Sequence, residues 1–463
     1  MNIEELKKEL FYVKQNANIK LSDELLDQVH SYCEAYKEFL DSSKTEREAC
    51  YSSIEMAKKR GFIPFSKNEK YKPGDKIYYI NRDKSLILAI IGKKSLKDGI
   101  KLAAAHIDSP RLDLKPNPLY EDSQLAFFKT HYYGGIKKYQ WTAVPLSLHG
   151  VILKANGEKV EVNIGEDEKD PVFCVNDLLP HLADLQMKRP AKDIVYGEDL
   201  NVLIGSKPFK DDEKSEMVKL NIMKILNEKY GIVERDFISA ELEMVPAFKA
   251  SDVGFDRSLI GSYGQDDRVC AYNSLRAILD CESPEYTVVT MLADKEEIGS
   301  DGNTGMNSYF FKYFIEDLAK IFETDGRTVL SNSECMSTDV GAAFDPTYAV
   351  AYEKNNSAMC GFGTIITKYT GARGKSGTSD ASAEFVDKIT RLLDSKEINW
   401  QTGELGKVDG GGGGTVAMFL AKLNMDVVDV GVPILSMHSP FEISSKVDVF
   451  ENYRAITSFF QQK

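Results

Sequence analysis

The sequence predicts an α/β protein interrupted by a β-rich insertion, and two patterns lead to this prediction. Apolar, β-branched runs such as residues 286–290 alternate with segments whose apolar residues recur at helical spacing, as in a sheet flanked by helices. From residue 114 to residue 248 this alternation gives way to short strands separated by turn residues. We therefore expect one domain built from residues 1–113 and 249–463, with an inserted domain of residues 114–248.

Composition and charge narrow the possible functions. The 463 residues are 43% hydrophobic and 28% charged, which is ordinary for a globular protein. A formal net charge of −13 disfavours nucleic acid or an anionic membrane as partner. The seven cysteines include no Cys-x-x-Cys pair, and no apolar run approaches the ~18 residues of a membrane span. The charged start of the chain is not a signal peptide, so we expect a cytoplasmic protein with reduced thiols.

The first hundred residues are predicted to be helical and then β. Helical spacing of apolar residues occurs in three segments, residues 3–15, 25–39 and 45–59. Two apolar runs then flank a four-residue turn and predict a hairpin of residues 76–80 and 85–91.

The next predicted strand, residues 101–110, carries His106 and Asp108 near its end. Residues two apart on an extended chain face the same side, so these two side chains can touch. A carboxylate behind a histidine fixes the tautomer of the ring and makes it a better metal ligand. A histidine merely hydrogen-bonded at a strand end is the equally weighted alternative.

The insertion is predicted to hold several strands and one helix. The strands are expected at residues 124–133, 146–154, 159–164, 194–196, 200–204 and 238–244, and the helix at residues 215–230. Asn156-Gly157 between two alternating runs is a strong hairpin signal. His131 and His149 are interpreted as structural. Pro180 opens a short helix at His181, for which spacing alone also favours a structural role.

After the insertion the α/β pattern resumes, and acidic residues again follow strands or begin helices. Helices are expected at residues 266–279, 306–322 and 381–393, after the glycine run 409–415, and from residue 447 onward. Asp266 and Asp267 begin the first of these helices, where capping is the simplest role for an acid. The strand of residues 286–290 leads to Glu296 and Glu297, and the run 426–438 is interpreted as a strand ending in His438. The glycine run lacks the Lys-Ser/Thr of a phosphate-binding loop, so nucleotide binding is not predicted.

Residues at strand edges form a candidate metal-binding set. Its members are His106, Asp108, Asp266, Glu296, Glu297, Asp339 and His438. Two histidines with several carboxylates suit a pair of divalent ions such as zinc, manganese or cobalt. The chain has no His-Glu-x-x-His and no Gly-x-Ser-x-Gly motif, which disfavours zincins and typical α/β-hydrolases.

In order and separation, these motifs resemble the aspartyl aminopeptidase / aminopeptidase I family. The segments that carry the resemblance are Ala105-His-Ile-Asp-Ser-Pro110, Gln265-Asp-Asp-Arg268, Asp294-Lys-Glu-Glu-Ile-Gly-Ser300, Ser337-Thr-Asp339, Met437-His-Ser-Pro440 and Leu179-Pro-His-Leu-Ala-Asp184. The resemblance implies a mixed α/β catalytic domain of the zinc-aminopeptidase type, two metal ions in each subunit, and an inserted dimerisation domain. It also implies a homododecamer built from dimers.

The resemblance further implies a role for each site residue. Asp266 would bridge the metals, His106 and Asp339 would complete one site, and Glu297 and His438 the other. Glu296 corresponds to the general base and Asp108 to the residue that orients a ligand. His181 corresponds to a histidine lent to a neighbouring subunit's active site. Asp267 is a departure, since some relatives have asparagine there, and it adds charge to the site.

The sequence thus predicts a metallo-aminopeptidase that removes acidic or neutral N-terminal residues from peptides. Two alternatives stay open at this point, a related two-metal hydrolase of N-acyl amino acids or other amides, and a metal-binding scaffold without catalysis. An acidic substrate side chain would need a cation in the pocket that binds it. Lys368, Arg373 and Lys375, beside a glycine-rich segment, are the candidates.

Overall fold

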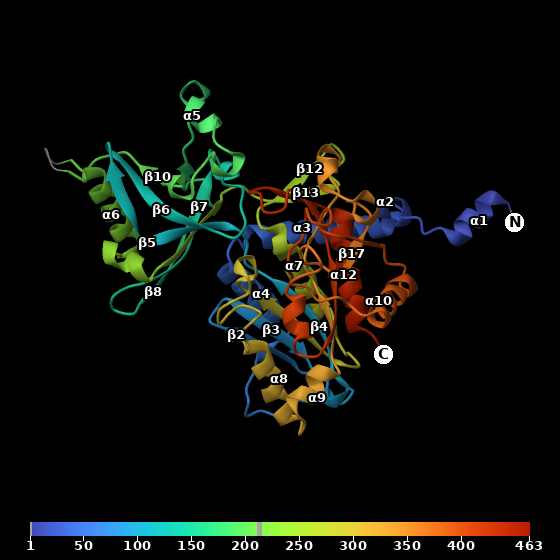
Figure 1. Cartoon of the computed structure of the whole chain (residues 1–463). Coiled ribbons are helices and arrows are strands. Elements are labelled where there is room, and N and C mark those ends of the chain that lie inside the picture. Colours follow the sequence, from blue (N-terminus) through green and yellow to red (C-terminus); the bar gives the residue numbers. More distant parts are fainter. Residues whose placement is uncertain (1, 211–214) are drawn as a thin grey trace.

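The computed structural model describes residues 2–210 and 215–463. Figure 1 shows two lobes side by side, one built around a large sheet flanked by helices and one that is mostly β. The helices of the first lobe and of the N-terminal extension are α1 (Ile3–Leu10), α2 (Ala17–Lys20), α3 (Asp23–Asp41), α4 (Glu46–Lys59), α7 (Gln265–Leu279), α8 (Phe310–Ile321), α9 (Gly326–Ser331), α10 (Ala383–Ser395), α11 (Ala417–Ala421) and α12 (Lys446–Phe460). Within the described residues, no helix combines the length and the apolar character needed to cross a bilayer.

A nine-stranded mixed sheet organises the first lobe. Its strands, in spatial order, are β1 (Ile63–Pro64), β2 (Lys76–Asn81), β3 (Ser85–Ile90), β14 (Thr287–Ala293), β4 (Ile100–His106), β15 (Glu334–Ser337), β19 (Asp426–Gly431), β17 (Thr364–Thr367) and β18 (Trp400–Thr402). The four strands β14, β4, β15 and β19 are parallel to one another. Their carboxyl ends therefore meet at one edge, where α/β proteins usually bind ligands.

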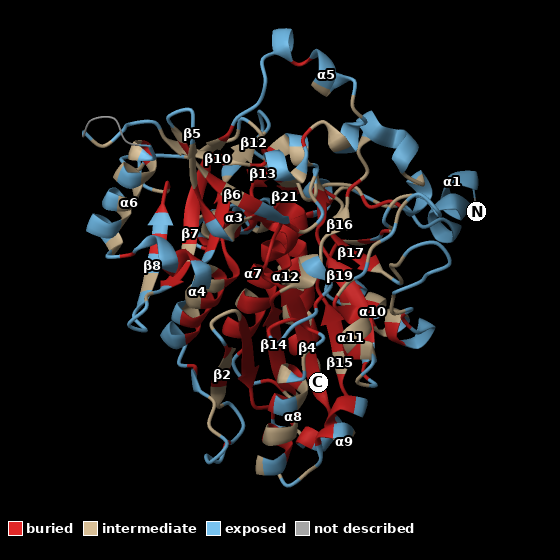
Figure 2. Cartoon of the chain, turned by 60° about the vertical axis from the view of Figure 1, so that its left-hand side comes forward, coloured by how far each residue is buried: buried red, intermediate tan, exposed pale blue. Residues whose placement is uncertain are grey.

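Helices cover both faces of this sheet because the strands are apolar on both sides. On β4, Ala103 and Ala105 join a core with α3, α4, α7, α10 and α12, whereas Leu102 and Ala104 join a core with α8, α9 and α11. Successive strand residues point to opposite faces, so one strand contributes to both cores. In Figure 2 these central strands are buried, while α1 is exposed.

The second lobe contains a seven-stranded antiparallel sheet. In spatial order its strands are β8 (Lys159–Ile164), β7 (Leu146–Leu153), β11 (Glu241–Pro246), β5 (Arg111–Asp122), β6 (Leu125–Tyr133), β10 (Val202–Gly205) and β9 (Cys174–Val175). Helix α6 (Met217–Tyr230) packs on this sheet, and its core centres on residues such as Trp141 and Phe128. An exposed arm carries the 3₁₀ turn Pro180–Leu182 and α5 (Asp184–Met187), which projects from the lobe in Figures 1 and 2.

A small five-stranded sheet lies beside the large one. Its strands are β12 (Ser251–Val253), β13 (Leu259–Ser262), β21 (Glu442–Ser445), β20 (Pro433–Leu435) and β16 (Gly341–Ala342). Strand β13 leads into α7, whose second residue is Asp266, and β20 leads into the turn that holds His438. This sheet therefore positions two of the expected metal ligands.

The mixed α/β fold is confirmed, and the two predicted hairpins form. The single strand expected over residues 426–438 is wrong: its backbone partners change at residue 432, so β19 joins the large sheet and β20 the small one. Residues 194–196 form no strand, and the helix expected over residues 3–15 ends at Leu10.

Candidate metal centre

The expected metal ligands converge on the carboxyl edge of the parallel strands. His106 is the last residue of β4, and Glu296 and Glu297 form a 3₁₀ turn three residues after β14. Asp339 follows β15, while Asp266 and His438 reach the same place from the small sheet. The convergence explains why residues up to 332 positions apart in sequence can act on one ligand.

Asp266 lies between the two histidines. Its Oδ1 is 3.1 Å from His106 Nε2, and its Oδ2 is 3.2 Å from His438 Nε2. One carboxylate therefore presents one oxygen to each side of the site. This is the arrangement required of a residue that bridges two cations.

A further carboxylate stands beside each histidine. Asp339 Oδ1 is 3.7 Å from His106 Nε2, and Glu297 Oε2 is 3.4 Å from His438 Nε2. Asp266, Glu297 and His438 offer ligand atoms that all lie within 4.8 Å of one another. His106 and Asp339 form a second such group together with Asp267.

Asp108 links His106 to the glutamate turn. Its backbone carbonyl accepts a hydrogen bond from His106 Nδ1 at 3.0 Å and its Oδ1 lies 3.3 Å from the same nitrogen, which leaves Nε2 of the ring facing Asp266. The backbone N–H groups of Glu296 and Glu297 donate to its two oxygens at 3.1 and 3.2 Å, and Tyr133 donates its hydroxyl at 2.8 Å. Asp108 thus sets the histidine tautomer through its carbonyl and carboxylate, and its buried carboxylate fixes the position of both glutamates.

Glu296 faces the same centre from the other side of His106. Its Oε2 lies 3.9 Å from His106 Nε2. Burial, together with the negative charges of Asp339 and Asp266 and against the opposing charge of His106, raises the pKa of the Glu296 carboxyl to about 8. A carboxylate in such a site is suited to accept and release a proton near neutral pH.

The electrostatics of the site fit bound cations. Both oxygens of Asp267 and Oε1 of Glu297 are buried without a hydrogen-bond partner among the described residues. Burial raises the pKa of each of these two carboxyls well above its ordinary value, with neighbouring Asp339 and Asp266 adding to the effect. Burial alone would lower the pKa of His106, but the carboxylates of Asp108, Asp266 and Asp339 raise it. So much buried negative charge requires positive charge to balance it.

One residue of the centre, Glu442, was not identified from the sequence, and another, Asp267, was identified only in part. Glu442 accepts the backbone N–H of Asp266 at 3.0 Å and that of His438 at 2.7 Å, so it ties together the two chain segments that carry those ligands. Its position at the start of β21 gave no signal, because the segments it joins are distant in sequence. Asp267 was recognised only as added charge, although its carboxylate lies with His106 and Asp339.

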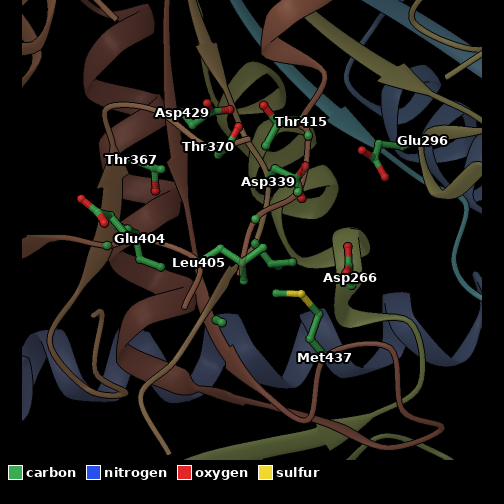
Figure 3. Close-up of a pocket in the computed structure, with 18 of the residues that line it drawn as sticks. Asp266, Glu296, Asp339, Thr367, Thr370, Glu404, Leu405, Thr415, Asp429 and Met437 are labelled. Carbon is green, nitrogen blue, oxygen red and sulfur yellow. The ribbon is translucent and has the colours of Figure 1, made fainter. Parts of the chain in front are cut away.

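A cavity of about 350 Å³ opens beside these residues. Figure 3 shows Asp266 and Glu296 on one side of it, Asp429 and Thr370 on the other, and Asp339 and Thr415 between them. Apolar side chains of Val340, Ile365, Leu405 and Met437 line the walls, and Gly412–Gly414 contribute backbone. A side chain on Gly412 would approach the Gly371 carbonyl to 2.2 Å, which explains the glycine there.

The three basic residues expected to bind substrate do not line this cavity. Arg373 and Lys375 lie along a neighbouring depression beyond Glu404 and Leu405, and Lys375 forms an ion pair with Asp380 at 2.9 Å. Lys368 lines neither space. His181 is exposed on the arm of the β-rich lobe and is likewise absent from the lining.

Comparisons with known proteins agree with this geometry. Residues 39–460 match the family described as aminopeptidase I zinc metalloprotease (M18). A probable M18 family aminopeptidase 1 from Clostridium acetobutylicum is 52% identical over 96% of this chain and 97% of its own length. The crystal structure of an M18 aminopeptidase from Thermotoga maritima is 44% identical, covers 98% of this chain and 100% of its own, and superimposes with a TM-score of 0.94. The fold is also that of the S. cerevisiae mApe1 dodecamer, at 19% identity over 93% of this chain and 96% of that one, with a TM-score of 0.75.

Proposed function

Since this chain belongs to the M18 family of aminopeptidases, which are zinc metalloproteases, we propose that its candidate metal centre is the catalytic site for removing N-terminal residues from peptides. The observation that carries this proposal is the placement of Asp266 between His106 and His438, with Glu296 at the same centre. A merely structural site would have no need of an additional buried glutamate beside its ligands.

Two zinc ions fit the side chains present. His106, Asp266 and Asp339 would hold one ion, while Asp266, Glu297 and His438 would hold the other. Three protein ligands for each metal leave positions open for water and substrate. When bound, the ions supply Lewis acidity, which lowers the pKa of a water molecule and polarises a scissile carbonyl.

The chain's own residues account for orientation and proton transfer. Glu296 accepts a proton from the attacking water and delivers it to the leaving amine, a role consistent with its raised pKa. Asp108 keeps His106 Nε2 directed at the centre and holds the backbone of Glu296 in place. Glu442 fixes the backbones of Asp266 and His438. Buried carboxylates around the cavity favour a substrate whose α-amine is free and positively charged, as an exopeptidase requires.

The arm of the β-rich lobe suits contact with a second copy of the chain. Its exposed apolar side chains are Leu178, Leu179, Leu182, Leu185 and Met187. A row of exposed apolar residues on a projecting segment is typical of an interaction site. We assign to residues 114–248 the dimer contacts, and to His181 a place at a neighbouring subunit's active site in a dodecamer. The dodecameric mApe1, which shares the fold, supports this assembly.

The proposed function can be tested with the purified protein and two matched substrates. Leucine p-nitroanilide should be hydrolysed, a chelator should abolish its turnover, and added zinc should restore it. N-acetyl-leucine p-nitroanilide, in which the α-amine is blocked, should not be cleaved. Comparable turnover of the acetylated substrate would show an amidase without exopeptidase selectivity, and turnover unaffected by metal removal would exclude the metal centre from catalysis.

A further inference from the structure

A buried carboxylate lies at the far part of the catalytic cavity. Asp429 occupies the middle of β19, where its strand neighbours are Ser337 of β15 and Thr367 of β17. Its side chain lines the cavity and is only 5% exposed. Ser337 Oγ donates to Asp429 Oδ1 at 2.6 Å, and Thr415 is its other hydroxyl partner. Among the described residues, no lysine, arginine or histidine forms an ion pair with it.

A second carboxylate borders the same space. Glu404 follows β18, is half-buried, and accepts the Tyr369 hydroxyl at 2.6 Å. In Figure 3 it lies near Leu405 at the side of the cavity away from Glu296. It too has no ion-pair partner in the described part of the chain.

The surroundings of these two carboxylates are apolar or hydroxylic. Val340, Ile365, Leu405 and Met437 form the walls, and Thr367, Thr370 and Thr415 add hydroxyl groups. No lysine or arginine occurs among the described residues that line the cavity. Apolar walls with negative groups beyond them complement a long aliphatic side chain that ends in a cation.

An acidic substrate side chain would meet the opposite situation. Its carboxylate would be desolvated beside Asp429 and Glu404, and none of the described residues that line the cavity is a lysine or arginine that could pair with it. Arg373 and Lys375 line a neighbouring depression that shares Thr370, Glu404 and Leu405 with the cavity, and Lys375 is paired there with Asp380. A neutral apolar side chain would contact the walls but leave the two carboxylates without a charged partner.

We propose that Asp429 and Glu404 make this cavity selective for peptides whose N-terminal residue is lysine or arginine. The inference rests on the proposed aminopeptidase function and specifies its substrate class. The methylene groups of the substrate side chain lie along the apolar walls, and the ammonium or guanidinium group pairs with Asp429 and Glu404. The enzyme therefore acts on basic N-termini, in contrast to the acidic or neutral preference expected from the sequence.

The test compares kcat/KM for lysine, arginine, leucine and glutamate p-nitroanilides in the zinc-loaded wild type. The kcat/KM for the lysine or arginine substrate should exceed that for leucine on the order of 10-fold, because a hydrogen bond to a charged group discriminates by about that factor. The difference from the glutamate substrate should be larger. Asp429→Asn should lower the lysine-to-leucine ratio on the order of 10-fold, and Glu404→Gln should lower it by a smaller factor. Glu404 is half-buried, so Glu404→Gln should fold and its lysine-to-leucine ratio can be measured even if Asp429→Asn does not fold.

Asp426→Asn is the matched control, since Asp426 is an exposed aspartate at the start of the same strand. It should leave the ratio unchanged. Faster turnover of leucine or glutamate than of both basic substrates overturns the inference while leaving the aminopeptidase function intact. An unchanged ratio in both pocket variants also overturns it. If the zinc-loaded protein cleaves none of the four anilides, the proposed function itself fails.

Discussion

The carboxylates at the two ends of the catalytic cavity differ in what balances their negative charge. At the metal end, Asp266 contacts both His106 and His438, and the proposed ions would add more positive charge. At the pocket end, the described partners of Asp429 and Glu404 are hydroxyl groups. Positive charge is therefore supplied by the histidines and the proposed ions at the metal end, and by the substrate at the end that binds its side chain.

This difference separates two kinds of substitution. A change at the metal end should slow every substrate by the same factor, because it alters chemistry common to all of them. A change at the pocket end should alter the ratio between substrates. If variants of the metal end changed the lysine-to-leucine ratio, the separation of catalytic rate from substrate selectivity would be wrong.

The largest effect is expected from Asp266→Ala. A bridging carboxylate serves both metals, so its loss should release both ions and reduce turnover of lysine and leucine p-nitroanilides alike to background. Elemental analysis of the purified variant measures the metals, and circular dichroism checks the fold. Retention of one ion per subunit would show that Asp266 does not bridge.

Glu296→Gln should have the next largest effect. The change is nearly isosteric and preserves the proposed ligands, so zinc content and fold should persist while kcat falls on the order of 10²-fold or more. The lysine-to-leucine ratio should not change. Glu282→Gln, at an exposed position before β14, is the control. A fully metallated Glu296→Gln enzyme with near-normal kcat would remove this residue from proton transfer.

His181→Phe extends the comparison to the subunit interface. If the arm completes a neighbour's active site, this variant should keep its metals and lose activity on the order of 10-fold. Mixing it with Glu296→Gln under conditions that exchange subunits should restore part of the rate, because some interfaces then combine an intact His181 with an intact Glu296. His131→Phe, an exposed histidine of the same lobe, is the control. Absence of any restoration in verified mixed oligomers would show that His181 acts within its own subunit or not at all.

The metal end could be predicted from the sequence, whereas the pocket end could not. His106, Glu296, Glu297 and Asp339 follow apolar strands, and the carboxyl ends of parallel strands meet at one edge of a sheet. Local pattern and a general rule of topology were therefore enough to bring them together. The roles assigned to them remain predictions.

No pattern in the sequence predicted Asp429 as a residue of the cavity. It stands inside the apolar run Val427-Val428-Asp429-Val430, which was interpreted as one strand continuing to His438. The change of sheet at residue 432 depends on long-range pairing with β15, β17, β16 and β21. A lone aspartate in a β-branched strand was the available clue, since such a buried acid needs a partner. Glu442 was missed for the same reason, because its two backbone donors come from distant segments.

The smallest expected effect concerns stability and again involves Asp429. Burial, opposed by hydrogen bonds from Ser337 and Thr415 and supported by the charge of Asp339, raises the pKa of its carboxyl to about 7. An unfolded aspartate has a pKa of about 3.9, so between about pH 4 and pH 7 the folded state holds a proton that the unfolded state has lost. This carboxyl therefore makes the folded state progressively less stable as pH rises through that window. Above about pH 7 the full loss of stability persists.

Asparagine cannot ionise, so Asp429→Asn should remove this dependence. The variant should be as stable as the wild type near pH 4 and have a Tm higher by about 1–3 °C at pH 8, a small shift because the chain is long. Differential scanning calorimetry of both zinc-loaded proteins across pH 4 to 8 measures the difference. Lysinol, which has a basic side chain, a free α-amine and no amide bond, should raise the wild-type Tm more than that of the variant at pH 8, because only the wild type offers the Asp429 charge. A variant that is less stable than the wild type at pH 8 would mean that the Ser337 and Thr415 hydrogen bonds outweigh the cost of burying the charge, and that Asp429 is retained for structure instead of for the substrate.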